Sequence, residues 1–260
     1  AGITSAAVAW VGGEYLIGDD PTIAGYSWTF MMAFVLTTSG LMTLLAMREP
    51  EPPTVRVPTP LGRRLKELPA LLRADRAFAR YVLARALATL GRMAAPFYIL
   101  FAGREIGLSG TTLAVLTIAF TLSGTVANLL WGALADRHGF RLAFLASIAL
   151  WVASTLGLML TSGLVPTTIV FVGLGAAFQG FQHSAMNLTL EFGSRDDLPM
   201  RIALANSGSE LAGTIGPLLG GLLAAALGYG SVFVTSMAFL TIGGIMVACW
   251  VPEPRHAARP

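Results

Sequence analysis

The sequence predicts an all-α protein that crosses a membrane several times. Hydrophobic residues make up 55% of its 260 residues and charged residues only 12%, which is too few charges to cover the surface of a soluble domain of this size. Apolar runs of bilayer length also recur along the chain, separated by polar segments. Both observations favour a bundle of transmembrane helices.

Eight apolar runs account for most of the chain, and seven of them are long enough for a full span. The first run, 1–17, is short and lacks the basic start and cleavage site of a signal peptide, so we expect the chain to begin inside a helix. The seven longer runs are 26–47, 78–102, 113–134, 142–160, 168–190, 202–227 and 232–251.

Basic residues indicate the orientation of these spans. Successive connecting segments lie on alternate sides of the membrane, and 14 of the 17 Lys and Arg residues fall on the same side. Arg104 falls on the other side, and Arg85 and Arg92 lie inside a span. Because Lys and Arg accumulate on the cytoplasmic side, that side is predicted to be cytoplasmic. This distribution explains the net charge of +3 without a nucleic-acid partner. The predicted cytoplasmic segments are 49–77, 136–141, 192–201 and 253–260.

A polar motif separates the runs 113–134 and 142–160. It reads Gly132-Ala-Leu-Ala-Asp136-Arg137-His138-Gly139-Phe140-Arg141. This resembles the loop signature of the major facilitator superfamily, roughly Gly-x-Leu-Ala-Asp-Arg-x-Gly-Arg-Lys, although Phe140 stands where a basic residue is usual. The resemblance implies the major facilitator fold and a secondary transporter, not an enzyme, that moves a small solute between two six-helix bundles by alternating access.

Two regions of the chain resemble each other across about 204 residues, as expected of an internally duplicated transporter. Gly25-Tyr26 parallels Gly228-Tyr229, and Glu49-Pro50 parallels Glu253-Pro254. By resemblance the chain then covers helices 5 to 12 of a facilitator, and the missing first four would be needed for transport. The expected domains are the last two helices of an N-terminal bundle, the first truncated, at 1–48, a cytoplasmic linker at 49–77, a six-helix C-terminal bundle at 78–252 and a cytoplasmic tail at 253–260.

The linker combines prolines with a short amphipathic pattern. Prolines between 50 and 60 prevent a helix there, whereas leucines from Leu61 to Leu72 recur at helical spacing beside Arg63, Arg64 and Lys66. This segment is predicted to lie on the inner leaflet, either as an ordinary linker helix or as a lipid sensor.

Two arginines and one glutamate are the most costly residues in the predicted spans. Arg85 and Arg92 are seven residues apart and so share a helix face, and lipid exposure would cost each about 2.5–3.5 kcal/mol. Arg92 is interpreted as a substrate or anion contact, or as half of a structural ion pair. Glu210 is the expected partner of Arg85 in an ion pair or, alternatively, a proton site.

The run 168–190 carries a slanted polar stripe that ends near Glu191. Its members are Gln179, Gln182, His183 and Asn187. These groups need water or polar partners inside a membrane, and the equivalent tenth helix lines the cavity in the family. We predict that they form a substrate wall together with Arg92, with His183 either hydrogen-bonded or exchanging protons.

A glycine-proline pattern lies in the run 202–227. It consists of Gly213, Gly216, Pro217, Gly220 and Gly221, and small residues allow close approach of helices. It resembles a pattern that is associated with export in the fifth helix of proton antiporters. We interpret it first as a packing element and second as a pointer to efflux.

The motif residues are expected to act as a gate. By resemblance, Asp136 would face the N-terminal end of the fifth helix and hold the two bundles together while the cavity is open outward. Arg137 or Arg141 is expected to pair with Glu191. Gly132 and Gly139 complete the gating motif.

Other classes of protein fit the sequence less well. It shows no nucleotide-binding loop, nucleophile-base pair or metal-ligand cluster, and no cofactor is expected. Its single cysteine, Cys249, is interpreted as a buried apolar residue. The alternatives left open are a nontransporting sensor or scaffold and a membrane-embedded lipid enzyme. Heavy use of Arg, Ala and Gly suggests a bacterial inner membrane as the location.

Overall fold

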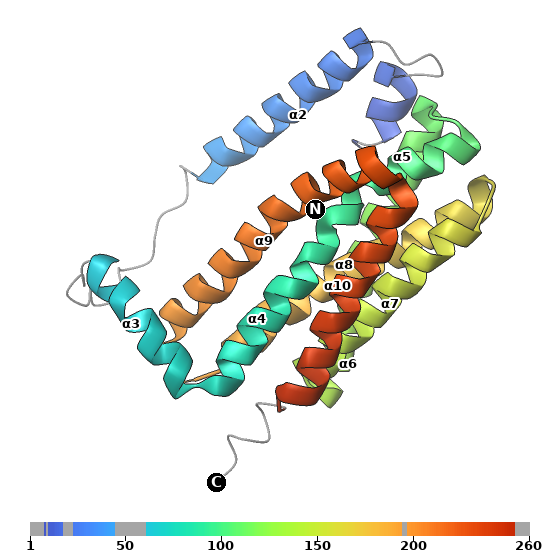
Figure 1. Ribbon diagram of the computed structural model, residues 1–260. Helices are drawn as coiled ribbons and strands as arrows, with labels where there is room; N and C mark the ends of the chain where they lie inside the picture. The colour runs from blue at the N-terminus through green and yellow to red at the C-terminus, as the bar shows by residue number, and fades with distance from the viewer. Residues whose placement is uncertain (1–7, 9, 18–22, 45–60, 194–196, 253–260) are drawn as a thin grey trace.

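The computed structural model describes residues 8, 10–17, 23–44, 61–193 and 197–252, and Figure 1 shows them as a helical bundle with one helix set apart. Within these residues the chain forms helices and turns, without a strand. Six helical segments there are long and apolar enough to cross a membrane, and their ends lie within four residues of the predicted ones. They are Arg76–Ile106, Gly110–His138, Phe140–Leu160, Leu164–Leu190, Leu198–Leu227 and Tyr229–Trp250.

The first of these spans is broken, which the hydropathy pattern did not predict. It consists of α4 (Arg76–Leu90), the 3-10 turn η2 (Gly91–Ala94) and α5 (Ala95–Ile106). Pro96 lies in the first turn of α5 and has no N–H to donate to the carbonyl of Arg92 four residues earlier. The N–H of Ala95 donates a hydrogen bond to that carbonyl instead, over three residues, as in a 3-10 helix.

Five long helices follow, and the chain reverses its direction between them. They are α6 (Gly110–His138), α7 (Phe140–Leu160), α8 (Leu164–Leu190), α9 (Leu198–Leu227) and α10 (Tyr229–Trp250). A single residue separates α6 from α7 and α9 from α10, namely Gly139 with φ 90° and Gly228 with φ 81°. Residues with a Cβ rarely adopt such angles, so glycine permits these one-residue reversals.

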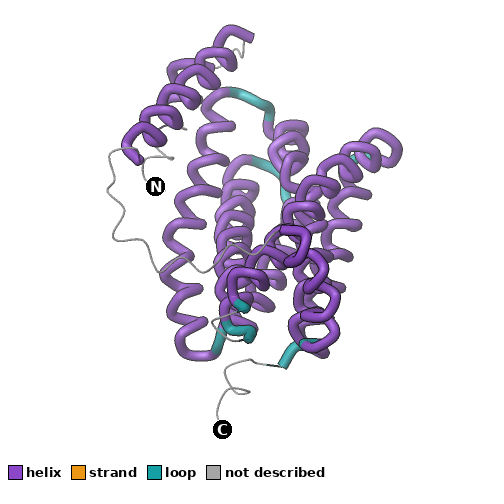
Figure 2. The backbone as a smooth tube through the Cα atoms, turned by 90° about the vertical axis from the view of Figure 1, so that its left-hand side faces the viewer, coloured by secondary structure: helices purple, strands orange, loops and turns teal. Residues whose placement is uncertain are grey.

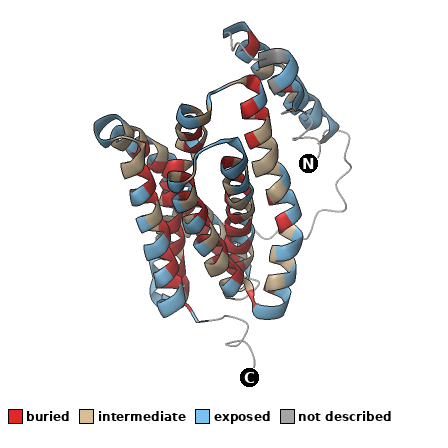
Figure 3. Cartoon of the chain, turned by 90° about the vertical axis from the view of Figure 1, so that its right-hand side faces the viewer, coloured by how far each residue is buried: buried red, intermediate tan, exposed pale blue. Residues whose placement is uncertain are grey.

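The bundle packs around aromatic side chains and close helix contacts, visible as the buried strips in Figure 3. α8 lies against both α6 and α7, while α4 lies against α9 and α10. A tight contact joins α6 and α8, where a Cβ on Gly175 would lie only 1.9 Å from the carbonyl oxygen of Phe120. The largest fully buried side chains include Trp151, Tyr81, Phe78, Phe144, Phe181 and Phe233.

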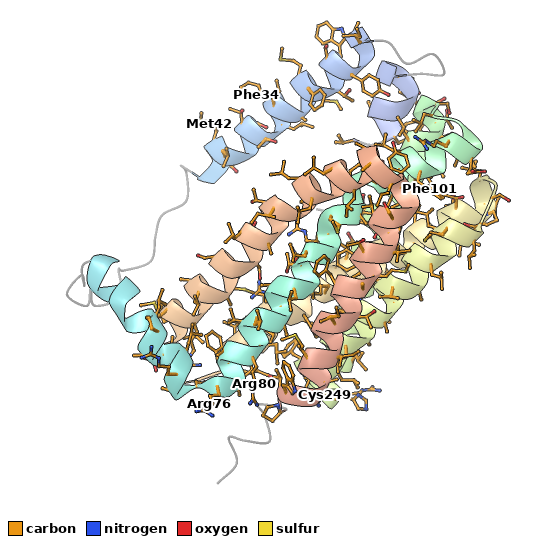
Figure 4. The ribbon with its side chains drawn as sticks, in the orientation of Figure 1. Phe34, Met42, Arg76, Arg80, Phe101 and Cys249 are labelled. Carbon is orange, nitrogen blue, oxygen red and sulfur yellow. The ribbon has the colours of Figure 1, made fainter. Side chains whose placement is uncertain are left out.

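The N-terminal part is less fully described. A π-helical turn, η1 (Gly12–Ile17), packs on α6, and α2 (Ile23–Leu44) packs on η1 away from the main bundle (Figure 2). α2 covers most of the run 26–47 that was predicted to be a full span, and residues 45–47 of that run lie outside the described residues. Over the described residues alone α2 is not among the six. Its apolar side chains are exposed, including Phe34 and Met42 in Figure 4.

Residues 49–60 of the expected linker and the whole expected tail, 253–260, lie outside the described residues. The amphipathic segment forms α3 (Leu61–Ala74), and its residues Leu71 and Leu72 pack against the core.

The charged side chains identify one end of the bundle. Figure 4 shows Arg76 and Arg80 near the start of α4, at the same end as Cys249 in α10, and Phe101 toward the other end. The start of α7 and of α9 adds Arg141 and Arg201. We call this the basic end. Cys249 is exposed there, contrary to the expectation of a buried residue.

Candidate functional site

Arg85 is buried between three helices and bonds only to uncharged groups among the described residues. Its side chain is 7% exposed. Its Nη1 donates to Oγ1 of Thr189 on α8 at 2.9 Å, and its Nη2 donates to Oδ1 of Asn206 on α9 at 3.0 Å. Thr189 donates in turn to the carbonyl of Ala185, which also accepts from the hydroxyl of Tyr81. Arg85 therefore connects α4, α8 and α9 through hydrogen bonds.

The structure replaces the expected Arg85–Glu210 ion pair with this arrangement. Arg85 lies nine residues from the start of α4, or roughly 14 Å along the axis. α9 begins at Leu198, so Glu210 lies 12 residues in, or roughly 18 Å, whereas Asn206 lies at roughly 12 Å. Asn206 is thus at the depth of Arg85, and Glu210 is one turn deeper with an exposed side chain.

Arg92 lies in the broken middle of the first span, on η2. Its Cζ is 5.4 Å from the centre of the Phe178 ring on α8, within the range of a cation–π contact. Gly213 on α9 leaves room beside it, since a Cβ there would lie 3.5 Å from Nη1. Among the described residues, this half-buried guanidinium has no ion pair.

The polar stripe of α8 divides into two parts. Gln182 and His183 are exposed, and the half-buried Asn187 donates from its amide to the carbonyl of His183. Gln179 instead packs against α6, where a Cβ on Gly124 would lie 2.6 Å from its Cγ. The stripe was expected to share one space with Arg92, but no contact in the described residues joins them.

Exposed polar groups in the middle of the spans lie mainly on α8 and α9, with Thr125 on α6 as a further one. On α9 they are Ser207, Glu210 and Thr214, which share one helix face because they are spaced by three and four residues. The exposed side chains of α7 and α10 are apolar, apart from Thr241 and Cys249. We call the six residues Gln182, His183, Asn187, Ser207, Glu210 and Thr214 the polar face.

The polar face is incompatible with contact to lipid tails. A carboxylate near the centre of a span costs about 2.5–3.5 kcal/mol on insertion scales, and unsatisfied amides cost more inside hydrocarbon than in water. The six groups therefore fit a water-filled space or a second set of helices. Sequence reasoning missed Ser207, although its spacing of three residues from Glu210 was a signal.

An ion pair at the basic end was also missed. Asp75 caps α4, with Oδ1 accepting from the N–H of Phe78 at 2.9 Å and Oδ2 accepting from Nη1 of Arg201 at 2.6 Å. The side chain of Arg201 is only 6% exposed and lies 4.8 Å from the centre of the Phe78 ring. This contact ties the start of α4 to the start of α9. The signal was an Asp at the N-cap position directly before an apolar run.

Comparison with protein families identifies the kind of protein. A family model described as the Major Facilitator Superfamily matches residues 81–260. The chain belongs to the major facilitator superfamily. Among curated proteins, no match was found. Facilitators are membrane transporters, and the matched region contains nearly all of the six spans. Among the described residues, no group of three or more His, Cys, Asp or Glu could hold a metal ion.

The facilitator motif is more helical than the sequence suggested. α6 continues through His138, so Gly132, Asp136 and Arg137 are helical and only Gly139 lies between the two helices. Gly139 has φ 90° and ψ 157° and bonds the carbonyl of Ala135 at 2.8 Å. The hydropathy pattern ended the helix early because its last turn is polar.

Arg141 caps a neighbouring helix and is not directed at Glu191. Its guanidinium donates to the carbonyls of Val247 and Ala248, in the last turn of α10. The carbonyl of Val247 also accepts from the N–H of Val251, whereas Pro252, four residues after Ala248, has no N–H to donate. A cation at a helix C-terminus is favourable. The expected pairing of Arg141 with Glu191 is therefore replaced by a contact within the bundle. Arg137 and Asp136 are exposed at the end of α6.

Three glycines of the glycine-proline pattern of this facilitator, Gly213, Gly216 and Gly220, face η2 or the end of α4. A Cβ would lie 3.4 Å from the carbonyl of Leu90 at Gly216 and 2.8 Å from the carbonyl of Met93 at Gly220. At Gly221 a Cβ would meet nothing within 4 Å, so the packing role expected for this residue has no described partner. Pro217 lies inside α9 and is half-buried.

Proposed function

We propose that this facilitator moves a small solute by alternating access, with the polar face of α8 and α9 forming one wall of the solute pathway. The observation that carries the proposal is the polar face itself, because its exposed amide, imidazole and carboxylate groups cannot face lipid at reasonable cost. The opposite wall would come from a second bundle, to which α2 and η1 belong. Transport on this account needs the four helices that precede the first one here.

Two arginines lie within the first span of the bundle. Arg85 holds α4, α8 and α9 in register through its bonds to Thr189 and Asn206. Arg92 lies farther along the same span and has no ion pair in the described residues, so it is the candidate contact for a solute. We assign Arg85 a positioning role and Arg92 a binding role.

Two groups on the polar face could couple solute movement to protons. An imidazole and a carboxylate are the side chains that most often relay protons in transporters, and His183 and Glu210 supply one of each. Both side chains are exposed on the polar face. We propose proton coupling through one of them. The glycine-proline pattern of α9 supports efflux as the direction, and the composition supports a bacterial inner membrane as the location.

Counterflow measurements test this function. Protein with both bundles is reconstituted into liposomes and screened with a panel of labelled small solutes that includes organic anions. We expect at least one solute to exchange, with Gln182→Ala and Arg92→Ala lowering the rate more than tenfold, and Leu90→Ala changing it less than twofold at matched expression. Absence of exchange for every solute, or equal effects of the three substitutions, would contradict the proposal.

A further inference from the structure

A second candidate site lies inside the bundle, away from the polar face. It is a cavity of about 320 Å³ between α5, α6, α7 and α8. Its walls are mainly aromatic and aliphatic, and they include Tyr98, Phe120, Trp151, Phe171, Leu174 and Phe178. Pockets of roughly 300–1,000 Å³ lined in this way typically hold small organic ligands. None of the six polar-face residues lines it.

The polar atoms of Tyr98 and Trp151 in the walls are already engaged, and Thr117 adds one hydroxyl to the lining. The hydroxyl of Tyr98 lies 2.9 Å from Oγ1 of Thr155 and accepts a bond from Nε1 of Trp151 at 2.9 Å. These bonds leave the aromatic ring surfaces as the part that a guest would contact. The cavity therefore suits a flat apolar body, because rings stack edge-to-face or offset against such walls.

One charged group packs on a wall residue of the cavity. Phe178 lines the cavity, and Cζ of Arg92 is 5.4 Å from the centre of that ring. Ala95 and Ile99 also line the cavity and follow Arg92 by three and seven residues, which places all three on one side of the η2–α5 segment. The apolar cavity and the cation are thus neighbours.

The charge of Arg92 distinguishes this cavity from a simple packing defect. Within the described residues the guanidinium has no carboxylate partner, although it lies in the middle of a membrane span. Such a cation is costly in a membrane unless an anion or water compensates it. A carboxylate or sulfonate on the guest would pair with it through charge-assisted hydrogen bonds, which are about twice as strong as neutral ones.

We propose that this cavity binds the aromatic body of a small organic anion, whose acidic group pairs with Arg92. The proposal deepens the proposed transport function, because it assigns the solute class, but it concerns binding alone. The cavity provides the apolar contact and Arg92 selects the charge.

Direct binding measurements on the purified protein test the two parts separately. The probes are tritiated 2-naphthoate and its uncharged analogue 2-naphthylmethanol, measured by scintillation proximity in detergent. We expect saturable binding of both, with 2-naphthoate at least tenfold tighter. Ala95→Phe fills the cavity and should lower the affinity for both probes at least tenfold. Arg92→Gln should lower the affinity for 2-naphthoate at least tenfold and change the affinity for 2-naphthylmethanol less than twofold.

Matched variants control for general effects. Ala149→Phe adds the same ring at an exposed position on α7, and Arg104→Gln removes an arginine whose Cζ lies 4.3 Å from the ring of Tyr229, outside the cavity. Both should bind like the unaltered protein. If the binding of 2-naphthoate does not saturate, or is unchanged in Ala95→Phe, the cavity is not its binding site. If Arg92→Gln lowers the affinity for both probes equally, the charge of Arg92 does not select the anion.

The transport proposal can fail independently of this one. Saturable binding of 2-naphthoate that Ala95→Phe abolishes, without exchange of any solute in liposomes, would support the site and contradict transport. Exchange of other solutes with no binding of 2-naphthoate would support transport and overturn the site.

Discussion

Two adjacent glycines on α9 provide a matched test of how the helices pack beside Arg92. A Cβ on Gly220 would lie 2.8 Å from the carbonyl oxygen of Met93 and 3.1 Å from Cε2 of Phe97, whereas a Cβ on Gly221 would meet nothing within 4 Å. The Met93 atom belongs to the backbone of η2, so it cannot move aside as a flexible side chain would. Gly220→Ala must therefore push α9 away from η2.

The size of the effect follows from two opposing contributions. Replacing glycine by alanine in a helix gains up to about 1 kcal/mol in helix propensity, and this gain applies to both positions. Overpacking a tight contact costs about 1–3 kcal/mol, and only Gly220→Ala incurs it. We therefore expect Gly220→Ala to be less stable than Gly221→Ala by about 1–3 kcal/mol, since the propensity terms cancel.

Unfolding by SDS in mixed micelles, followed by far-UV circular dichroism, measures this difference. We expect Gly221→Ala to match or exceed the unaltered protein and Gly220→Ala to unfold at lower SDS. Equal midpoints for the two variants would refute the contact between α9 and η2. Because η2 carries Arg92, Gly220→Ala should also lower the affinity for any ligand that Arg92 binds.

Three further predictions concern the contacts at and near the basic end. Thr189→Val removes an acceptor of the buried Arg85 and should lower the free energy of unfolding by about 1–3 kcal/mol, measured in the same SDS assay. Asp75→Asn leaves the buried Arg201 without its charge partner and should cost about 3–5 kcal/mol; unchanged stability would show that the pair is dispensable. Asp136→Asn should slow transport and shift the protein toward the inward-open state while leaving insertion intact. Distances between spin labels on the two bundles would show this shift. Unchanged distances with normal transport would show that the motif only connects two helices and has no gating role.

Hydropathy and charge were sufficient to predict the all-α bundle. Membrane-length apolar runs located all six spans of the C-terminal bundle, because burial in lipid requires about 20 apolar residues whatever the packing. The same patterns located helix ends less well. α6 extends four residues past Leu134, since a helix can continue beyond the bilayer on polar residues such as Asp136.

The partners of individual side chains could not be predicted in the same way. Arg85 was expected to meet Glu210 because both are charged, yet the register of α9 places Asn206 at its depth. A register of this kind depends on contacts among three helices, which local sequence does not encode. The break at η2 did have a local signal, Pro96, whose missing N–H accounts for the 3-10 turn.

The central claim is that the polar face of α8 and α9 meets water, whereas the exposed sides of α7 and α10 meet lipid. Cysteine labelling tests it most directly, after Cys249, the single cysteine of this sequence, and any cysteine in the remaining helices are replaced by alanine. The four positions to compare are His183 and Glu210 on the polar face, and Leu156 and Ile242, which are 46% and 49% exposed on α7 and α10.

All four side chains are exposed on the bundle, so the labelling compares their surroundings and not their burial. In membranes containing the protein with both bundles, a charged maleimide should label His183→Cys and Glu210→Cys and leave Leu156→Cys and Ile242→Cys unmodified. Equal labelling of the four, or protection of His183→Cys and Glu210→Cys, would contradict a water-filled pathway along this face.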